Sequence, residues 1–109
     1  VTSADSGRLL ENMVYLALRR KDFEVSYFEG KRECNFIARR NNDFYPIQVT
    51  HEINEGNKKR EVEGLIEACK TVGVQEGMII THDDENEIIE GGVRIKILPA
   101  WKGLSELSG

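Results

Sequence analysis

The sequence predicts an α/β domain in which a mixed β-sheet is flanked by helices. Two long segments place apolar residues at helical spacing, and five shorter runs are rich in β-branched and aromatic residues. Along the chain the predicted order is helix, three strands, helix, two strands. A helix between the third and fourth strands implies a crossover connection, which parallel pairing requires.

The first helix is predicted to end near Lys21-Asp22. Its apolar residues recur three and four positions apart, and they are Leu9, Leu10, Met13, Val14, Leu16, Ala17 and Leu18. Ser6 is a candidate N-cap, and Asp5 lies close to the positive end of the helix dipole. Because the apolar stripe is wide, we expect other elements to cover most sides of this helix.

Three strands are predicted next, over Phe23–Phe28, Cys34–Ala38 and Tyr45–Thr50. Residues 41–43, Asn-Asn-Asp, indicate a hairpin turn between the second and third strands, because Asn and Asp tolerate a left-handed backbone. Pro46 should lie near the start of its strand, where a missing N–H does least harm.

The second half of the chain begins with a predicted helix. Its apolar residues have i, i+3, i+4, i+7 spacing, and they are Val62, Leu65, Ile66 and Cys69. Gly73 is placed to cap the end of this helix. Strands are expected over Glu76–Thr81 and Val93–Leu98, and an acidic loop, His82–Glu87, follows the first of them.

The chain is predicted to close with a short helix, with Pro99 in its first turn and Trp101 anchoring the core. Cys34 and Cys69 are far apart and form no CxxC pair. We therefore expect two small buried side chains rather than a disulfide or a metal site.

Size and charge restrict the functional classes. The 109 residues favour a single domain, 1–109, and the missing initiator Met leads us to expect a domain excised from a longer chain. A net charge of -4 argues against strong, sequence-independent DNA binding by the whole surface. No apolar run approaches the roughly 20 residues that span a bilayer, and the polar start is unlike a signal peptide. We expect a cytoplasmic protein that does not bind membranes.

Five segments carry a family resemblance when they are taken in order. They are GRLLENMVYLALRR, ECNFIARRNNDFYPIQVT, KREVEGLIEAC, EGMIITHDDENE and ILPAWK, and they extend from Gly7 to about Leu104. Together they resemble the C-terminal domain of a family of prokaryotic AAA-type ATPases, the DUF4143-containing ATPases. The resemblance implies a restriction-endonuclease-like, or PD-(D/E)xK nuclease-like, core in the order α-β-β-β-α-β. ATP would then bind in the N-terminal part of the longer protein, because no GxxxxGK[ST] loop occurs here.

In nucleases of this fold, an acid on the first helix, an Asp on the second strand and E-x-K on the third bind one or two divalent ions. The matching positions here are Glu11, Asn35, Gln48 and Thr50. The resemblance therefore implies a degenerate site without catalytic residues. Asn35 and Gln48 remove two negative charges, and Thr50 offers no ammonium group. Strand alternation puts Gln48 and Thr50 on the same side of their strand.

We expect this domain to bind no metal or other cofactor. A neutral amide oxygen is a far weaker Mg²⁺ ligand than a carboxylate. Glu11 and Glu33 are the residual acids that could hold a weakly bound ion, and Mg²⁺ is expected only if the domain is a nuclease. His51 and His82 lack ligand spacing, and the acidic loop lacks the Gly and distal Glu of an EF-hand.

Basic residues cluster in turns and at the ends of elements. The simplest interpretation is a solvated surface, and the alternative is contact with nucleic-acid phosphates around the former active site. These residues are Lys31, Arg32, Arg39, Arg40, Lys58, Lys59 and Arg60.

Three functions are consistent with this sequence. The first is a catalytically degenerate nuclease-fold domain of an AAA-type ATPase, which contacts the body of the ATPase or a protein partner. The second is a non-catalytic domain that binds nucleic acid such as DNA. The third is a weakly active nuclease that depends on a divalent metal. The three substitutions favour the first, in which this domain is not an enzyme, and the sequence does not indicate an oligomeric state.

Overall fold

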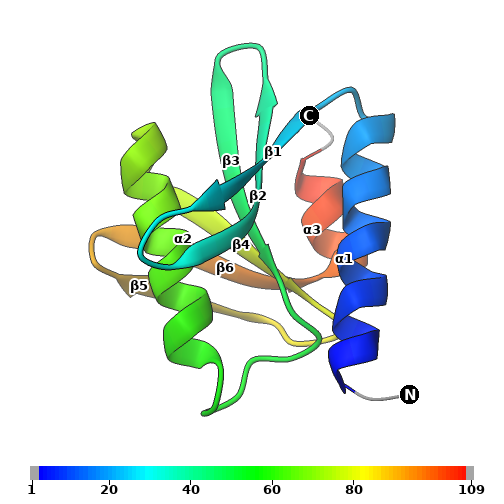
Figure 1. Ribbon diagram of the computed structural model, residues 1–109, viewed down its shortest axis with the longest axis vertical. Helices are drawn as coiled ribbons and strands as arrows, with labels where there is room; N and C mark the ends of the chain where they lie inside the picture. Colours follow the sequence, from blue (N-terminus) through cyan, green and yellow to red (C-terminus); the bar gives the residue numbers. More distant parts are fainter. Residues whose placement is uncertain (1–2, 108–109) are drawn as a thin grey trace.

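The computed structural model describes residues 3–107 as three helices around one six-stranded mixed sheet (Figure 1). The strand order is β1-β2-β3-β4-β6-β5, in which β3, β4 and β6 are parallel and the other neighbours antiparallel. The α/β class and the mixed sheet are therefore confirmed. The elements are α1 (Ser3–Arg20), β1 (Glu24–Glu29), β2 (Glu33–Arg40), β3 (Asp43–Val49), α2 (Lys58–Val72), β4 (Glu76–Thr81), β5 (Asn86–Glu90), β6 (Val93–Pro99) and α3 (Ala100–Glu106).

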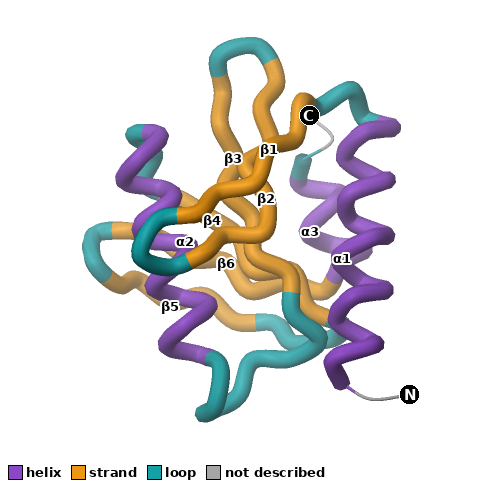
Figure 2. The backbone as a smooth tube through the Cα atoms, in the orientation of Figure 1, coloured by secondary structure: helices purple, strands orange, loops and turns teal. Residues whose placement is uncertain are grey.

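The helices form a layer on each face of the sheet. Figure 2 shows α2 on one face, with α1 and α3 side by side on the other. Strand side chains alternate between the faces, so each layer has its own core. The core under α2 includes Cys34, Val62, Leu65, Cys69, Ile79 and Ile95. The core under α1 and α3 includes Val14, Leu18, Phe23, Ile47, Ile80 and Leu98.

Several predictions from local sequence are confirmed. Both cysteines are buried and free. Gly73 ends α2 in the left-handed conformation, with φ 79°, and its N–H donates to the Cys69 carbonyl. Asn41 adopts φ 59° in the turn between β2 and β3. Among the described residues, no helix is long and apolar enough to cross a membrane.

Three predicted boundaries are wrong. The predicted acidic loop His82–Glu87 overlaps an unpredicted strand, because β5 begins at Asn86 and pairs with β6 at the sheet edge. Its apolar residues are only Ile88 and Ile89, of which Ile88 is half-buried, so no alternation marks it as a strand. Ser6 lies inside α1 rather than capping it, because the helix begins at Ser3. Pro99 ends β6 and precedes α3 instead of entering its first turn.

The outer side of α1 is exposed, contrary to our expectation. Leu9 is 66% exposed, and Met13 and Leu16 are about half exposed. The reason is that α3 has only seven residues and covers little of α1 beyond the side facing the sheet. Trp101 is 73% exposed, so it is not a core anchor, and the buried residues of α3 are instead the small Ala100 and Gly103.

Pro46 separates β3 from β4 at one end of the sheet. Thr50 N–H donates to the Ile80 carbonyl at 3.0 Å. The equivalent bond four residues earlier on each strand would join the N–H of residue 46 to the Glu76 carbonyl. Residue 46 is a proline and has no N–H, so this bond cannot form. That carbonyl accepts the Cys69 thiol at 3.5 Å instead. The two strands are accordingly paired only next to Gln48, over three residues of each strand.

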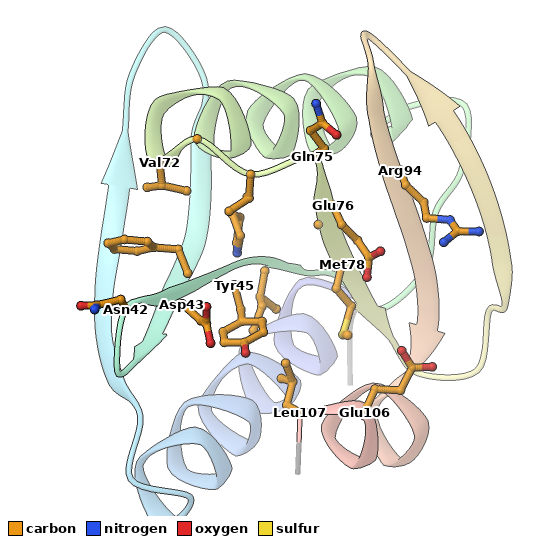
Figure 3. A pocket seen from close by; sticks show the side chains of 16 residues that line it. Asn42, Asp43, Tyr45, Val72, Gln75, Glu76, Met78, Arg94, Glu106 and Leu107 are labelled. Carbon is orange, nitrogen blue, oxygen red and sulfur yellow. The ribbon is translucent and has the colours of Figure 1, made fainter. Parts of the chain in front are cut away.

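The separated strands border a cleft of about 690 Å³ (Figure 3). Tyr45, Met78 and Leu107 line it, together with the carboxylates Asp43 and Glu106. Among the described residues, none that the sequence marked as a candidate site residue lines this cleft.

Candidate functional site

The structure brings together three of the four positions that the family resemblance assigns to a degenerate nuclease site. Glu11 lies on α1, Asn35 on β2 and Gln48 on β3, and hydrogen bonds connect them in that order. The connection passes through the sheet, because Asn35 bonds a residue of α1 whereas Gln48 bonds a residue of α2.

A β-bulge aims Asn35 at α1. Ser26 pairs with Ile37 and Phe28 pairs with Cys34, so two residues of β2 face Tyr27 alone. Those two residues are Asn35 and Phe36, so β2 contains one extra residue at this point. A bulge of this kind changes the direction of a side chain, and here the Asn35 side chain points to α1. The backbone ladder between β2 and β3 also ends here, since its last pair joins Phe36 to Ile47.

The Gln48 amide uses its acceptor and both of its donor hydrogens. Its Oε1 accepts the Asn35 backbone N–H at 2.9 Å. Its Nε2 donates to the Glu33 carbonyl at 2.8 Å and to the Glu61 carbonyl at 3.0 Å. The side chain is 2% exposed, so these bonds form in a largely water-free site. Gln48 thereby joins β3 to β2 and to the first turn of α2.

Asn35 repeats this arrangement toward the other face. Its Oδ1 accepts the Val49 backbone N–H at 2.8 Å, and its Nδ2 donates to the Glu11 carboxylate. Beyond the Phe36–Ile47 pair, side-chain amides therefore replace the backbone hydrogen bonds between β2 and β3. An ionised carboxylate at either position could accept the same N–H but could not donate. The surroundings of both side chains consequently favour amides.

Gly64 allows α2 to come this close to the sheet. A Cβ at this position would overlap the Glu33 carbonyl oxygen and lie 2.7 Å from Gln48 Nε2. Both Gly64 and the Glu61 carbonyl belong to the site, although sequence reasoning did not identify them. A glycine inside a predicted helix was the available signal, because glycine there costs stability unless close packing requires it.

Thr50 is not part of this cluster. Its hydroxyl donates to the Glu52 carbonyl and accepts from Asn57 Nδ2, both at 3.3 Å. Asn57 Nδ2 also donates to the Glu52 carbonyl at 2.8 Å. Thr50 thus orders the loop between β3 and α2 through contacts with Glu52 and Asn57.

Carboxylates surround the amides. Desolvation raises the pKa of Glu61, with a smaller contribution from Glu11, and the bonded Arg60 opposes this shift. Desolvation and the nearby Glu33 carboxylate raise the pKa of Tyr27. Among residues 3–107, no group of three or more His, Cys, Asp or Glu side chains is arranged to hold a metal ion.

A solvent-open hollow of about 490 Å³, called the cavity below, lies beside the Glu11–Asn35 pair. It lies between α1 and the bulged strands β1 and β2, and its lining includes Tyr15, Tyr27 and Phe36. These aromatic residues were not among the predicted site residues. The site is therefore a buried amide cluster next to an aromatic cavity.

Acidic residues contact two of the basic clusters. Glu67 accepts the backbone N–H groups of Lys31 and Arg32 at 2.9 and 3.1 Å. The Arg32 side chain pairs with Glu63 at 3.2 Å. Arg60 pairs with Glu61 at 3.3 Å.

The remaining basic residues differ in exposure. Arg40 is half-buried, lies 4.3 Å over the Phe23 ring and donates to the carbonyls of Lys21 and Leu107. Arg39 pairs with Glu24 at 3.7 Å. The last two, Lys58 and Lys59, are exposed at the start of α2.

The two histidines lie in the loops that follow β3 and β4. Their rings stack, with centroids 5.1 Å apart, and His82 N–H donates to the His51 carbonyl at 3.0 Å. Asp84 accepts the Ile53 backbone N–H at 2.9 Å. These contacts join the loops at the ends of two parallel strands.

Comparison with known proteins identifies the family. The uncharacterized protein MJ1544 of Methanocaldococcus jannaschii is 35% identical over 111 residues, and the match covers 92% of this chain. The chain spans about a quarter of the length of that relative, since the match covers 25% of it. The family described as "Domain of unknown function (DUF4143)" matches residues 6–102. The chain therefore belongs to the DUF4143 family.

Proposed function

We propose that this domain is a catalytically inactive nuclease-like interaction module within a larger AAA-type ATPase. The observation that carries the proposal is the Gln48 amide, which occupies the position of the E-x-K glutamate. Its Oε1 accepts one N–H and its Nε2 donates to two carbonyl oxygens. This polar group is complete without an ion.

Metal binding at this position would break the cluster. Gln48 Oε1 would have to leave the Asn35 N–H in order to coordinate an ion. A buried donor left without a partner costs about 1–3 kcal/mol. An amide oxygen also contributes no charge toward the desolvation of Mg²⁺, which dehydrates reluctantly. These costs support an inactive site.

The restriction-endonuclease-like assignment rests on element order and on the connected positions. The observed order begins α-β-β-β-α-β, and hydrogen bonds connect Glu11, Asn35 and Gln48, with the Asn35 amide bonded to α1 and the Gln48 amide to α2. The greater length of MJ1544 supports a place within a longer chain. ATP binding belongs to another part of that chain in this proposal. The partner is then the ATPase body or a second protein.

Nucleic-acid binding receives less support from the contacts. Arg32, Arg39 and Arg60 are in ion pairs, which a phosphate would have to displace. Arg40 turns its guanidinium group to backbone carbonyls. Among the basic residues of these clusters that the structure describes, only Lys31, Lys58 and Lys59 are exposed without an ion pair.

A cleavage assay tests the absence of catalysis. Purified protein is incubated with plasmid and branched DNA in Mg²⁺ and in Mn²⁺, and Glu11→Ala serves as the contamination control. We expect the wild type and the variant to give the same background. Cleavage that is lost in Glu11→Ala would refute the proposal.

A second variant tests the physical argument directly. Asn35→Asp combined with Gln48→Glu and Thr50→Lys restores the nuclease residue types. We expect this triple variant to be less stable than the wild type without Mg²⁺, because the carbonyls of Glu33 and Glu61 lose their donors. A triple variant as stable as the wild type would show that the amide cluster is not required.

A further inference from the structure

The cavity beside Glu11 has aromatic walls from three different elements. Tyr15 belongs to α1, Tyr27 to β1 and Phe36 to β2. The rings of Tyr15 and Phe36 have centroids 6.0 Å apart. Tyr27 is 58% exposed, so a large part of its ring is open to solvent at the cavity. Aromatic faces of this kind attract cations.

Carboxylates give the same cavity a negative potential. Glu11 lines it. Partial desolvation raises the pKa of Tyr27, and the nearby carboxylates of Glu33, Glu29 and Glu11 raise it further. Among the described residues, no Lys or Arg lines the cavity. Arg19 does bond the Tyr15 hydroxyl, at 3.4 Å.

Glu11 has acceptor capacity that the fold does not use. Asn35 donates to its Oε2, and within residues 3–107 this is the one hydrogen bond to the carboxylate. A carboxylate can accept about four hydrogen bonds, including a paired set from a guanidinium group. Glu11 is half-buried, so solvent screens its charge less than at an open surface.

We propose that this cavity binds the guanidinium group of an arginine side chain presented by a partner protein. This inference rests on the proposed function for the existence of a partner. A guanidinium group is planar, stacks on aromatic faces and donates paired N–H bonds to a carboxylate. The lysine ammonium group supplies the charge without the planar face. The negative charge of the cavity would repel a phosphate group, so this cavity disfavours nucleic acid.

The first test is an NMR titration of the ¹⁵N-labelled 109-residue chain. The probe is N-acetyl-arginine amide, and the matched control is N-acetyl-citrulline amide, which has nearly the same shape but no charge. We expect the arginine probe to shift the amide signals of Glu11, Tyr27, Asn35 and Phe36 with saturation in the millimolar range. The citrulline probe should bind at least about tenfold more weakly.

Two variants locate the binding. Glu11→Gln removes the charge but keeps an oxygen that can accept the Asn35 bond, and it should weaken arginine binding about tenfold. Tyr27→Leu removes a ring and should also weaken it. Glu90→Gln removes an exposed carboxylate from β5, away from the cavity, and should bind arginine like the wild type.

Several results would overturn the inference. They are equal shifts from the two probes, the absence of shifts with arginine, shifts confined to the cleft between β3 and β4, and unchanged affinity in both Glu11→Gln and Tyr27→Leu. The cleavage assay separates this inference from the proposed function. Absent arginine binding without cleavage refutes only the guanidinium site, whereas Glu11-dependent cleavage refutes the inactive module.

Discussion

Replacing Gly64 with Ala should separate α2 from the sheet. The new methyl group would overlap the Glu33 carbonyl oxygen and lie 2.7 Å from Gln48 Nε2 and 3.0 Å from the Glu33 carbonyl carbon. The Glu33 backbone belongs to β2 and cannot turn aside as a flexible side chain could. We therefore expect α2 to withdraw by roughly 1 Å. That shift would weaken the bonds from Gln48 Nε2 to Glu33 and Glu61.

The magnitude follows from three contributions. Overpacking of a well-packed region costs about 1–3 kcal/mol, and an impaired buried donor adds about 1–3 kcal/mol. The higher helix propensity of Ala returns about 1 kcal/mol. The net loss should be about 1–5 kcal/mol. For a domain of this size that corresponds to a fall in Tm of roughly 5–20 °C.

Thermal and urea denaturation followed by circular dichroism measure this loss. The matched control is Gly7→Ala in α1, where an added Cβ meets nothing within 4 Å. Gly7→Ala should therefore be neutral or raise stability by up to about 1 kcal/mol. If Gly64→Ala were as stable as Gly7→Ala, the close approach of α2 to β2 would be refuted.

Three further predictions concern single side chains. Because the folded state raises the pKa of Glu61, ionisation of Glu61 costs stability as pH rises through that pKa. Glu61→Gln should therefore raise Tm at pH 7 and lose this advantage near pH 4, and an equal gain at both pH values would contradict the prediction. Burial raises the pKa of Cys34 to about 12 and that of Cys69 to about 11, so iodoacetamide at pH 8 should label neither thiol until the protein unfolds. Rapid labelling of the native protein would count against their burial. Trp101 is exposed, so acrylamide should quench its fluorescence nearly as well in the folded as in the unfolded protein, whereas strong protection would indicate that a second molecule covers α3.

Much of the fold could be predicted because strong local signals agree with it. Val93, Ile95 and Ile97 alternate with exposed or half-buried basic residues in β6, as period-two patterning requires. Such signals fail where an element is defined by its partner. The edge strand β5 has little apolar patterning and is identified by its register with β6. The exposed side of α1 shows that an apolar stripe does not reveal how much of it neighbours will cover.

The candidate site was predictable in three of its residues but not in its bonds. The family resemblance singled out Glu11, Asn35 and Gln48, and hydrogen bonds in the structure connect them. The bulge opposite Tyr27 left no sequence signal, because an extra residue exists only relative to the register of the neighbouring strand. The partners of Gln48 Nε2 are backbone carbonyls, which every residue carries.

The amides of Asn35 and Gln48 and the carboxylate of Glu11 have different roles in the site. The amide groups of Asn35 and Gln48 satisfy backbone groups on both faces of the sheet without adding charge. Glu11 is different, because a glutamine oxygen at that position could accept the same bond from Asn35. Its negative charge is therefore not needed to complete the internal hydrogen bonds. A half-buried carboxylate beside exposed aromatic rings is stabilised by a cation, and the fold supplies no Lys or Arg to the cavity from the part of the chain that the structure describes. In our proposal the amides replace the metal ion within the fold, and an arginine from a partner supplies the positive charge outside it.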